Sequence, residues 1–180
     1  MLLEDRYLVW RLKQGSRQAL CRIYDRHETD LLTLAKSLLG RTGQAEDVLQ
    51  DVFVRLIESI DTFELTGSLK GYLITCVANR ARDYLRKDRR RTGEPIEAAR
   101  AVESEQHGPL QEIIADEQRQ RLAAALAELP YEQREAVLLH LQAGLRFREI
   151  ARVQGVAAKT AWSRYRYGLD RLRSMLNGQV

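Results

Sequence analysis

The sequence predicts an all-α protein made of two small helical domains joined by a flexible linker, the second a helix-turn-helix domain. Apolar residues recur at three- and four-residue intervals along most of the chain, the period of a helix that is buried on one side. No alternating pattern of useful strand length interrupts that period. Gly93, Pro95, Gly108 and Pro109 bracket a polar stretch near the middle, where the period fades, and such a stretch indicates a boundary between domains.

The first domain, residues 1–91, is expected to contain three helices. Ser16 is a candidate cap for a helix that ends at Gly40. A second helix begins at Thr42 or the glycine after it, and its apolar positions predict a buried stripe of Val48, Leu49, Val52, Phe53, Leu56 and Ile57. Ser68 is a candidate cap for a third, long helix.

Residues 92–112 are expected to form an acidic linker, and residues 113–180 the second domain. Residues 92–118 hold one arginine against seven acidic residues, whereas the segments on either side are both net basic. Helical periodicity returns after the linker, and Pro130 separates two helices there. Two basic domains on an acidic tether suggest two separate binding surfaces.

The end of the chain predicts a helix-turn-helix centred on Gly155. Ile150, Ala151 and Val156 supply small or branched apolar contacts between two short helices, and the reversal at Gly155 often needs a positive φ. The following helix carries the polar, cationic and aromatic residues Lys159, Ser163, Arg164, Arg166 and Tyr167. Such a helix enters the major groove of DNA in helix-turn-helix proteins, so DNA is the first partner to expect. A small helical bundle without a ligand is the alternative.

The composition and motifs argue against an enzyme. The formal charge is +4, and the chain has no Gly-rich phosphate loop, nucleophile elbow or paired-histidine motif, so no catalytic residue, metal or cofactor is predicted. Cys21 and Cys76 are isolated and are expected to be buried thiols. No signal peptide or membrane-length apolar run is present, which predicts a cytoplasmic protein without membrane insertion.

Three segments of the first domain are further candidates, each with a plain structural alternative. Seven of the twelve residues in 80–91 are basic, which suits either phosphate binding or a solvated helix end. The loop 61–68 suits a pocket for an unstacked base beside Tyr72, or an ordinary connector. The acidic face of the helix 45–58 suits a protein partner or simple solubility.

Three stretches together resemble the extracytoplasmic-function (ECF) sigma factors, the smallest members of the main bacterial sigma family. The first is 45–56, Ala-Glu-Asp-Val-Leu-Gln-Asp-Val-Phe-Val-Arg-Leu. The second joins 71–86 to the arginines at 89–91, and the third is 129–139 with the helix-turn-helix after it. They follow the order and spacing of the family over nearly the whole chain, so the chain is identified as a member.

The resemblance implies a protein without catalytic activity that binds core RNA polymerase and directs it to promoter DNA. The implied polymerase contacts are the clamp of the largest subunit and the flap, and an anti-sigma protein is a further candidate partner. The residues implied for polymerase binding are Glu46, Asp47, Gln50, Asp51 and Arg55.

The resemblance also assigns promoter recognition to both domains. The first domain would open the minus-ten element and hold a flipped base of the non-template strand, through Phe63, Thr66, Ser68, Tyr72, Asn79, Arg82, Arg86 and Arg90. The second would read the minus-thirty-five element as duplex, through Lys159, Thr160, Trp162, Ser163, Arg166 and Tyr167.

The last helix departs from the family pattern at several positions. Ala157 replaces a capping serine, Trp162 replaces a basic residue, and Gly168 stands where alanine is common. These departures predict an unusual minus-thirty-five sequence. The alternative function is a stand-alone helix-turn-helix regulator, which would have no use for the first domain's acidic helix and strand-binding helix.

Overall fold

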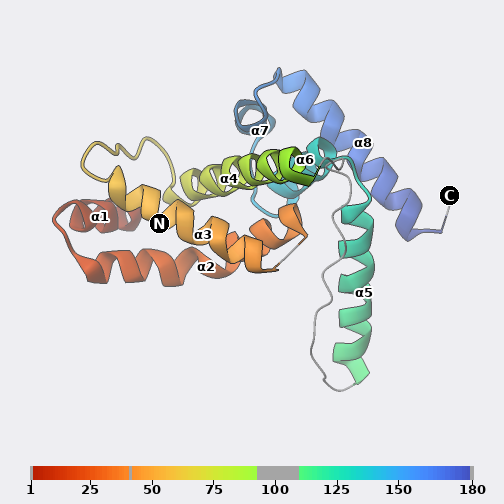
Figure 1. Cartoon of the computed structure of the whole chain (residues 1–180), viewed down its shortest axis with the longest axis horizontal. Coiled ribbons are helices and arrows are strands. Elements are labelled where there is room, and N and C mark those ends of the chain that lie inside the picture. The colour runs from red at the N-terminus through yellow and green to blue at the C-terminus, as the bar shows by residue number, and fades with distance from the viewer. Residues whose placement is uncertain (1, 41, 93–109, 179–180) are drawn as a thin grey trace.

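The computed structural model describes residues 2–40, 42–92 and 110–178, and the described part of the chain is entirely helical. The first domain contains α1 (Leu2–Lys13), α2 (Arg17–Leu39), α3 (Thr42–Glu58) and α4 (Leu69–Thr92). Figure 1 shows these helices gathered at one end of the molecule, with α4 running towards the other. α2 contacts α1, α3 and α4, so it is the central helix of this bundle.

Local signals fix the ends of these helices. Gly40 adopts φ +70° and its N–H donates to the Lys36 carbonyl at 2.8 Å, which closes the end of α2. The Ser68 hydroxyl accepts a hydrogen bond from the Gly71 N–H at 3.0 Å, as expected of a cap at the start of α4. Ser16 occupies the N-cap position of α2, but its side chain makes no capping hydrogen bond.

The second domain contains α5 (Leu110–Ala127), α6 (Tyr131–Leu141), α7 (Phe147–Gln154) and α8 (Ala158–Leu176). Here α8 packs on the three other helices. The predicted helix-turn-helix comprises α7, the turn at Gly155 and α8. Gly155 has φ +65°, and its N–H bonds back to the carbonyls of Ala151 and Arg152, so a left-handed residue ends α7 and turns the chain into α8.

The two domains pack against each other. α2 contacts α5 and α6, and α4 contacts α7. Buried residues of α2, α3 and α4 form one continuous apolar cluster with buried residues of α6 and α7, including Leu138, Leu139 and Ile150. Apolar burial of this kind is the main favourable term in association, so the packed arrangement has a physical basis beyond the covalent tether.

The predicted fold class is confirmed, and three further details differ from the prediction. α1 was not among the predicted helices, although it buries Leu8, Val9 and Leu12 against the first domain. Ile57 was expected in the buried stripe of α3, but it faces outward and is 43% exposed. Cys21 was expected to be buried and is exposed on α2.

Most of the predicted linker lies outside the described residues, which stop at 92 and resume at 110. α5 begins two residues before the predicted end of the linker at 112. None of the described helices is both long and apolar enough to cross a membrane.

Candidate nucleic-acid and partner interfaces

The predicted docking face of α3 carries both charge and apolar surface. Its exposed members are Glu46, Asp47, Gln50 and Arg55. Asp51 is half-buried, and the Nε of Arg80 on α4 donates to its carboxylate at 2.8 Å, so part of its charge is neutralised within the domain. Val54 and Ile57 are exposed on the same helix. An apolar patch rimmed by acidic groups suits a protein surface better than DNA.

The predicted minus-ten residues converge on one cavity of about 460 Å³. Those that line it are Phe63, Thr66, Ser68, Tyr72 and Asn79, from the loop and from α4. The rings of Phe63 and Tyr72 lie 4.6 Å apart between centroids and make an aromatic surface at the site. Burial raises the pKa of Tyr72 to about 12, so its phenol is neutral and keeps a hydrogen-bond donor.

The second domain forms the other side of this cavity. Gly144 and Leu145 precede α7, and Glu149, Arg152 and Val153 belong to it, and all five line the same space. The cavity therefore lies between the two domains in the packed arrangement. A nucleotide strand that reaches it must share the space with α7.

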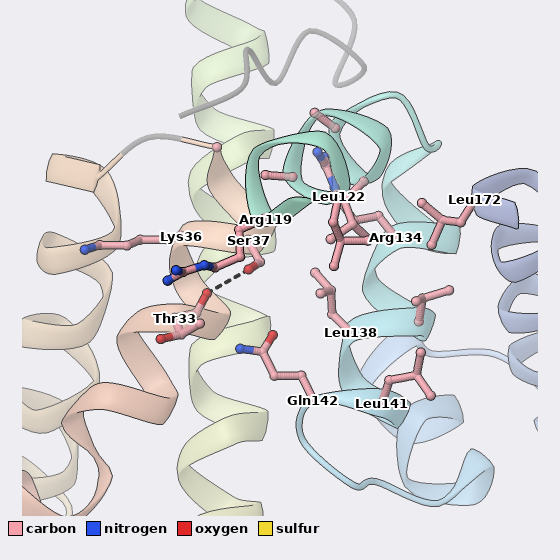
Figure 2. A pocket seen from close by; sticks show the side chains of 15 residues that line it. Thr33, Lys36, Ser37, Arg119, Leu122, Arg134, Leu138, Leu141, Gln142 and Leu172 are labelled. Carbon is pink, nitrogen blue, oxygen red and sulfur yellow. Dashed lines mark hydrogen bonds between the residues drawn. The ribbon is translucent and has the colours of Figure 1, made fainter. Parts of the chain in front are cut away.

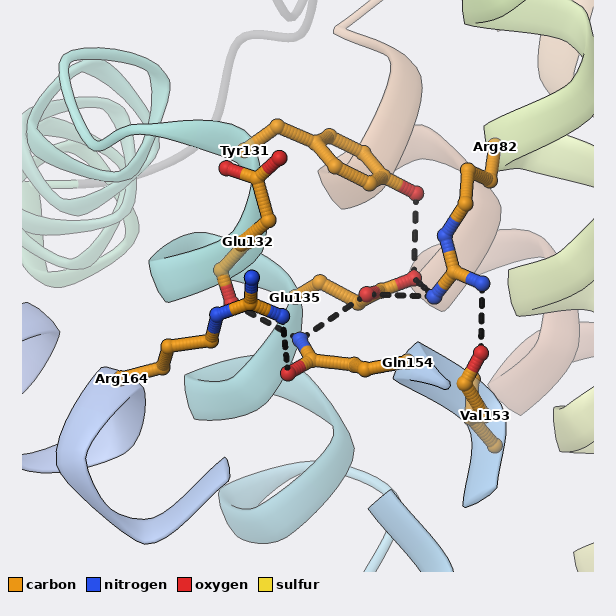
Figure 3. Close-up of polar contacts among 7 residues, drawn as sticks. All are labelled: Arg82, Tyr131, Glu132, Glu135, Val153, Gln154 and Arg164. Carbon is orange, nitrogen blue, oxygen red and sulfur yellow. Dashed lines mark hydrogen bonds and ion pairs between the residues drawn. The ribbon is translucent and has the colours of Figure 1, made fainter. Parts of the chain in front are cut away.

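Arg82 is held by the second domain, whereas Arg86 and Arg90 are exposed further along α4. As Figure 3 shows, the Nη2 of Arg82 donates to both carboxylate oxygens of Glu135 at 2.7 Å, and the Nη1 donates to the Val153 carbonyl at 2.5 Å. Glu135 on α6 is completely buried, while a quarter of the Arg82 side chain is exposed. Arg82 is thus the side chain that joins α4 to both α6 and α7.

The Glu135 carboxylate is the centre of a wider polar network. It also accepts hydrogen bonds from the Tyr131 hydroxyl at 3.2 Å and from the Gln154 amide at 3.0 Å. Gln154 in turn accepts a hydrogen bond from Arg164 of α8 at 3.0 Å (Figure 3). The contact between the domains is therefore linked by hydrogen bonds to the relative placement of α7 and α8.

Burial and pairing shift the pKa values of Glu135 and Arg82 in opposite directions. Burial raises the pKa of the Glu135 carboxyl. The charge of Arg82 opposes that shift, as do the hydrogen bonds that Arg82, Gln154 and Tyr131 donate to the carboxylate. Burial alone would lower the pKa of Arg82, and the Glu135 carboxylate reverses the effect so that the pKa rises. The Glu135 carboxylate thus depends on the Arg82 guanidinium to offset the cost of burying its charge.

The predicted minus-thirty-five residues lie along α8. Those with exposed side chains are Lys159, Thr160, Trp162, Arg166 and Tyr167. Ser163 is half-buried and its hydroxyl donates to the Lys159 carbonyl at 3.0 Å. The guanidinium carbon of Arg166 lies 5.1 Å from the Trp162 ring centroid and 5.0 Å from that of Tyr167, so the cation is stacked against two aromatic rings.

The close packing of α8 on α6 explains why a glycine stands at position 168, which the sequence did not reveal. It is buried where α8 crosses α6, and a Cβ at this position would lie 3.0 Å from the Val137 Cγ2 and 3.2 Å from the Gln133 carbonyl oxygen. An alanine Cβ would therefore be tighter than ordinary packing, and Val137 or Gln133 would have to give by a few tenths of an ångström. The glycine lets α6 and α8 approach closely at this crossing.

An apolar cavity of about 510 Å³ lies between α2, α5 and α6, with Leu172 of α8 on one side (Figure 2). Leu122 and Leu141 line it and are 43% and 60% exposed, so apolar surface continues to the outside. Arg134 also lines it and is almost fully buried, and its Nε and one Nη find no hydrogen-bond partner among the described residues. Burial lowers the pKa of the Arg134 guanidinium.

The sequence did not single out Glu135 or Gln154, and it placed Arg80 only within the basic segment 80–91, because their partners lie far away in sequence. One signal was present for Glu135, because it stands beside the apolar run Ala136–Leu139 on a short helix. A carboxylate in such a place is seldom buried without a cation. No local pattern identifies Arg82 as that cation. Within the described ranges, no three His, Cys, Asp or Glu side chains cluster in a way that suits a metal ion.

Comparison with known proteins finds two family models, one for each domain of the chain. Residues 23–91 match the family model of sigma-70 region 2, and residues 119–172 match that of sigma-70 region 4. The chain is 27% identical to the ECF RNA polymerase sigma-E factor of Escherichia coli (strain K12), over 99% of this chain and 95% of the relative. It is 30% identical to the ECF RNA polymerase sigma factor EcfG of Rhodopseudomonas palustris (strain TIE-1), over 81% of this chain and 78% of the relative.

The fold is also similar to a solved sigma factor. The sigma factor RpoE from Bartonella quintana, in complex with the anti-sigma factor NepR, aligns with a TM-score of 0.70 and 29% identity, over 87% of this chain and 95% of that one. The two region models match consecutive parts of the chain and together span most of its described helices. The chain belongs to the ECF family of RNA polymerase sigma factors.

Proposed function

We propose that this sigma factor binds core RNA polymerase through α3 and recognises promoters through two surfaces, the loop and α4 in one domain and α8 in the other. The observation that carries the proposal is the meeting of Phe63, Thr66, Ser68, Tyr72 and Asn79 at one cavity with an aromatic pair. Aromatic rings beside small polar groups suit an unstacked base. A stand-alone duplex-binding regulator has no need for such a cavity.

In this proposal the minus-ten strand runs from the cavity along α4. The exposed guanidinium groups of Arg86 and Arg90 neutralise phosphates, and Arg82 joins them when it is free. Arg82 cannot bind Glu135 and a phosphate at the same time, and α7 shares the cavity. Strand capture therefore requires the two domains to separate.

Polymerase docking is assigned to the exposed part of α3, with Glu46, Asp47 and Gln50 around Val54 and Ile57. Asp51 is a weaker anchor because it already pairs with Arg80. Asp47→Lys should lower the affinity for core polymerase, and Asp25→Lys on the exposed face of α2 is the matched charge control. Equal affinity of both variants would contradict the docking role of α3.

The apolar cavity at α5 and α6 is proposed as the contact for the polymerase flap. Its exposed rim, Leu122 and Leu141, offers apolar surface, and Arg134 offers a charge to a carboxylate of the incoming segment. Leu141→Glu should weaken polymerase binding, whereas Leu176→Glu, at the exposed end of α8, should not. A Leu141 variant with unchanged affinity would exclude this contact.

In this proposal residues 1–91 dock on the polymerase and recognise the minus-ten element. Residues 113–180 recognise the minus-thirty-five element. Such a factor acts in the cytoplasm, has no catalytic activity of its own, and has an anti-sigma protein as a further candidate partner, as the NepR-bound relative has. Run-off transcription with core polymerase tests the whole proposal. A chain that binds duplex DNA but supports no initiation would favour the stand-alone regulator.

A further inference from the structure

The exposed surface of α8 carries a tryptophan side chain near the start of the helix. Trp162 lies within the first two turns of α8 and is 44% exposed. In a helix-turn-helix, residues near the start of the second helix face the base edges. Trp162 therefore occupies a base-facing position, in the frame of the proposed function.

Trp162 is the large apolar side chain among the exposed residues at the start of α8. The Ser163 hydroxyl donates its hydrogen to the Lys159 carbonyl, and Ala158 carries only a methyl group, whereas Lys159 and Thr160 are exposed and polar. The indole itself has a single N–H donor and a broad apolar face. The apolar group that base-pair edges present in the major groove is the C5 methyl of thymine.

Arg166 and Tyr167 hold this surface in place. The Arg166 guanidinium carbon lies over the rings of Trp162 and Tyr167, at 5.1 and 5.0 Å from their centroids. A stacked cation restricts the rotamers of all three side chains before DNA arrives. Less conformational freedom is then lost on binding, which favours a defined contact over a loose one.

We propose that Trp162 recognises a thymine in the upstream duplex element by contact with its 5-methyl group, and that Arg166 positions the indole for that contact. The inference rests on the minus-thirty-five role proposed for α8 and adds the base that is read. It makes Trp162 a specificity-determining residue and predicts a T·A pair at the position that it faces.

The test uses the full chain assembled with core polymerase, and a duplex selected from random DNA placed upstream of a fixed minus-ten segment. Each thymine of the selected element is replaced in turn by uracil, which removes only the methyl group, and the Kd is measured. One replacement should weaken binding by wild type about fourfold, the effect of leaving one methyl unburied. The same replacement should have no effect on the Trp162→Ala holoenzyme.

Trp162→Phe is the conservative variant and should keep the uracil sensitivity, because it retains an apolar ring. Trp162 is exposed, so both variants are expected to unfold at the same temperature as wild type. A uracil effect of equal size in wild type and Trp162→Ala, or none at any thymine, overturns the assignment while leaving promoter recognition intact. A selection that enriches no upstream duplex contradicts the role of α8 itself, and with it both proposals.

Discussion

Arg82→Met should open the contact between the two domains. The side chain of Arg82 pairs with Glu135 and the Val153 carbonyl, both in the second domain, so its replacement disturbs the contact between the domains rather than the interior of either. Methionine fills similar space without the charge. In the packed state the completely buried Glu135 carboxylate then loses the cation that hydrogen-bonds to it, whereas in the separated state water can solvate it.

The size of the effect follows from the burial of the pair. Removal of one partner from a buried ion pair costs about 3–5 kcal/mol, and the low end applies because a quarter of the Arg82 side chain is exposed. A change of about 3 kcal/mol shifts the equilibrium between packed and separated domains roughly 150-fold towards separation.

Single-molecule energy transfer between dyes on the two domains measures this equilibrium. Cys21 is exposed on α2 and accepts one dye, and Asp170→Cys on α8 accepts the other in a Cys76→Ala background. Arg86→Met is the matched control, because Arg86 is exposed one turn further along α4 and its loss removes the same charge. Identical transfer distributions for the two variants would refute the reasoning.

Three further predictions concern single side chains. Gly168→Ala should lower the melting temperature. The clash with Val137 and the Gln133 carbonyl costs about 1–3 kcal/mol, whereas the gain in helix propensity is at most about 1 kcal/mol. A higher melting temperature would contradict the close packing. Ala157→Ser should supply the missing side-chain cap of α8 and raise the melting temperature by about 2–4 °C, and an unchanged value would show that the cap is not formed. Tyr72→Ala should weaken binding of a non-template oligonucleotide by the holoenzyme by about 1–3 kcal/mol, whereas Tyr72→Phe should retain it. With the phenol pKa near 12, Tyr72 itself should add no pH dependence to that affinity between pH 7 and 9, and a titration in that range would contradict the assignment.

The helical period was sufficient to predict most of the fold. The helices that begin near Ser16, Thr42 and Ser68 each bury a stripe with regular spacing, and Gly40 and Gly155 end helices with the positive φ that glycine allows. α1 escaped prediction because exposed Leu3, Tyr7 and Trp10 interleave with its buried residues, so the apolar positions do not define one face.

The contact between the domains could not be predicted in this way. Arg82 and Glu135 are 53 positions apart in sequence, and Arg82 lies on the same face of the helix as the exposed Arg86, four positions later. Pairing across such a separation depends on tertiary packing, which periodicity does not report. The same limit applies to Gly168, where helix propensity suggests a defect and the close approach of α6 supplies the reason.

In the proposed function, the packing of the domains would also set an order of events. The aromatic and cationic face of α8 is exposed while the domains are together, whereas Arg82 and the cavity at Tyr72 become fully available only after they part. A site that exists in a minor fraction of molecules binds its ligand with an affinity reduced by that fraction. If the proposed roles hold, contact with the upstream duplex would precede capture of the melted strand. A partner that holds the domains apart would then favour the second step without touching DNA.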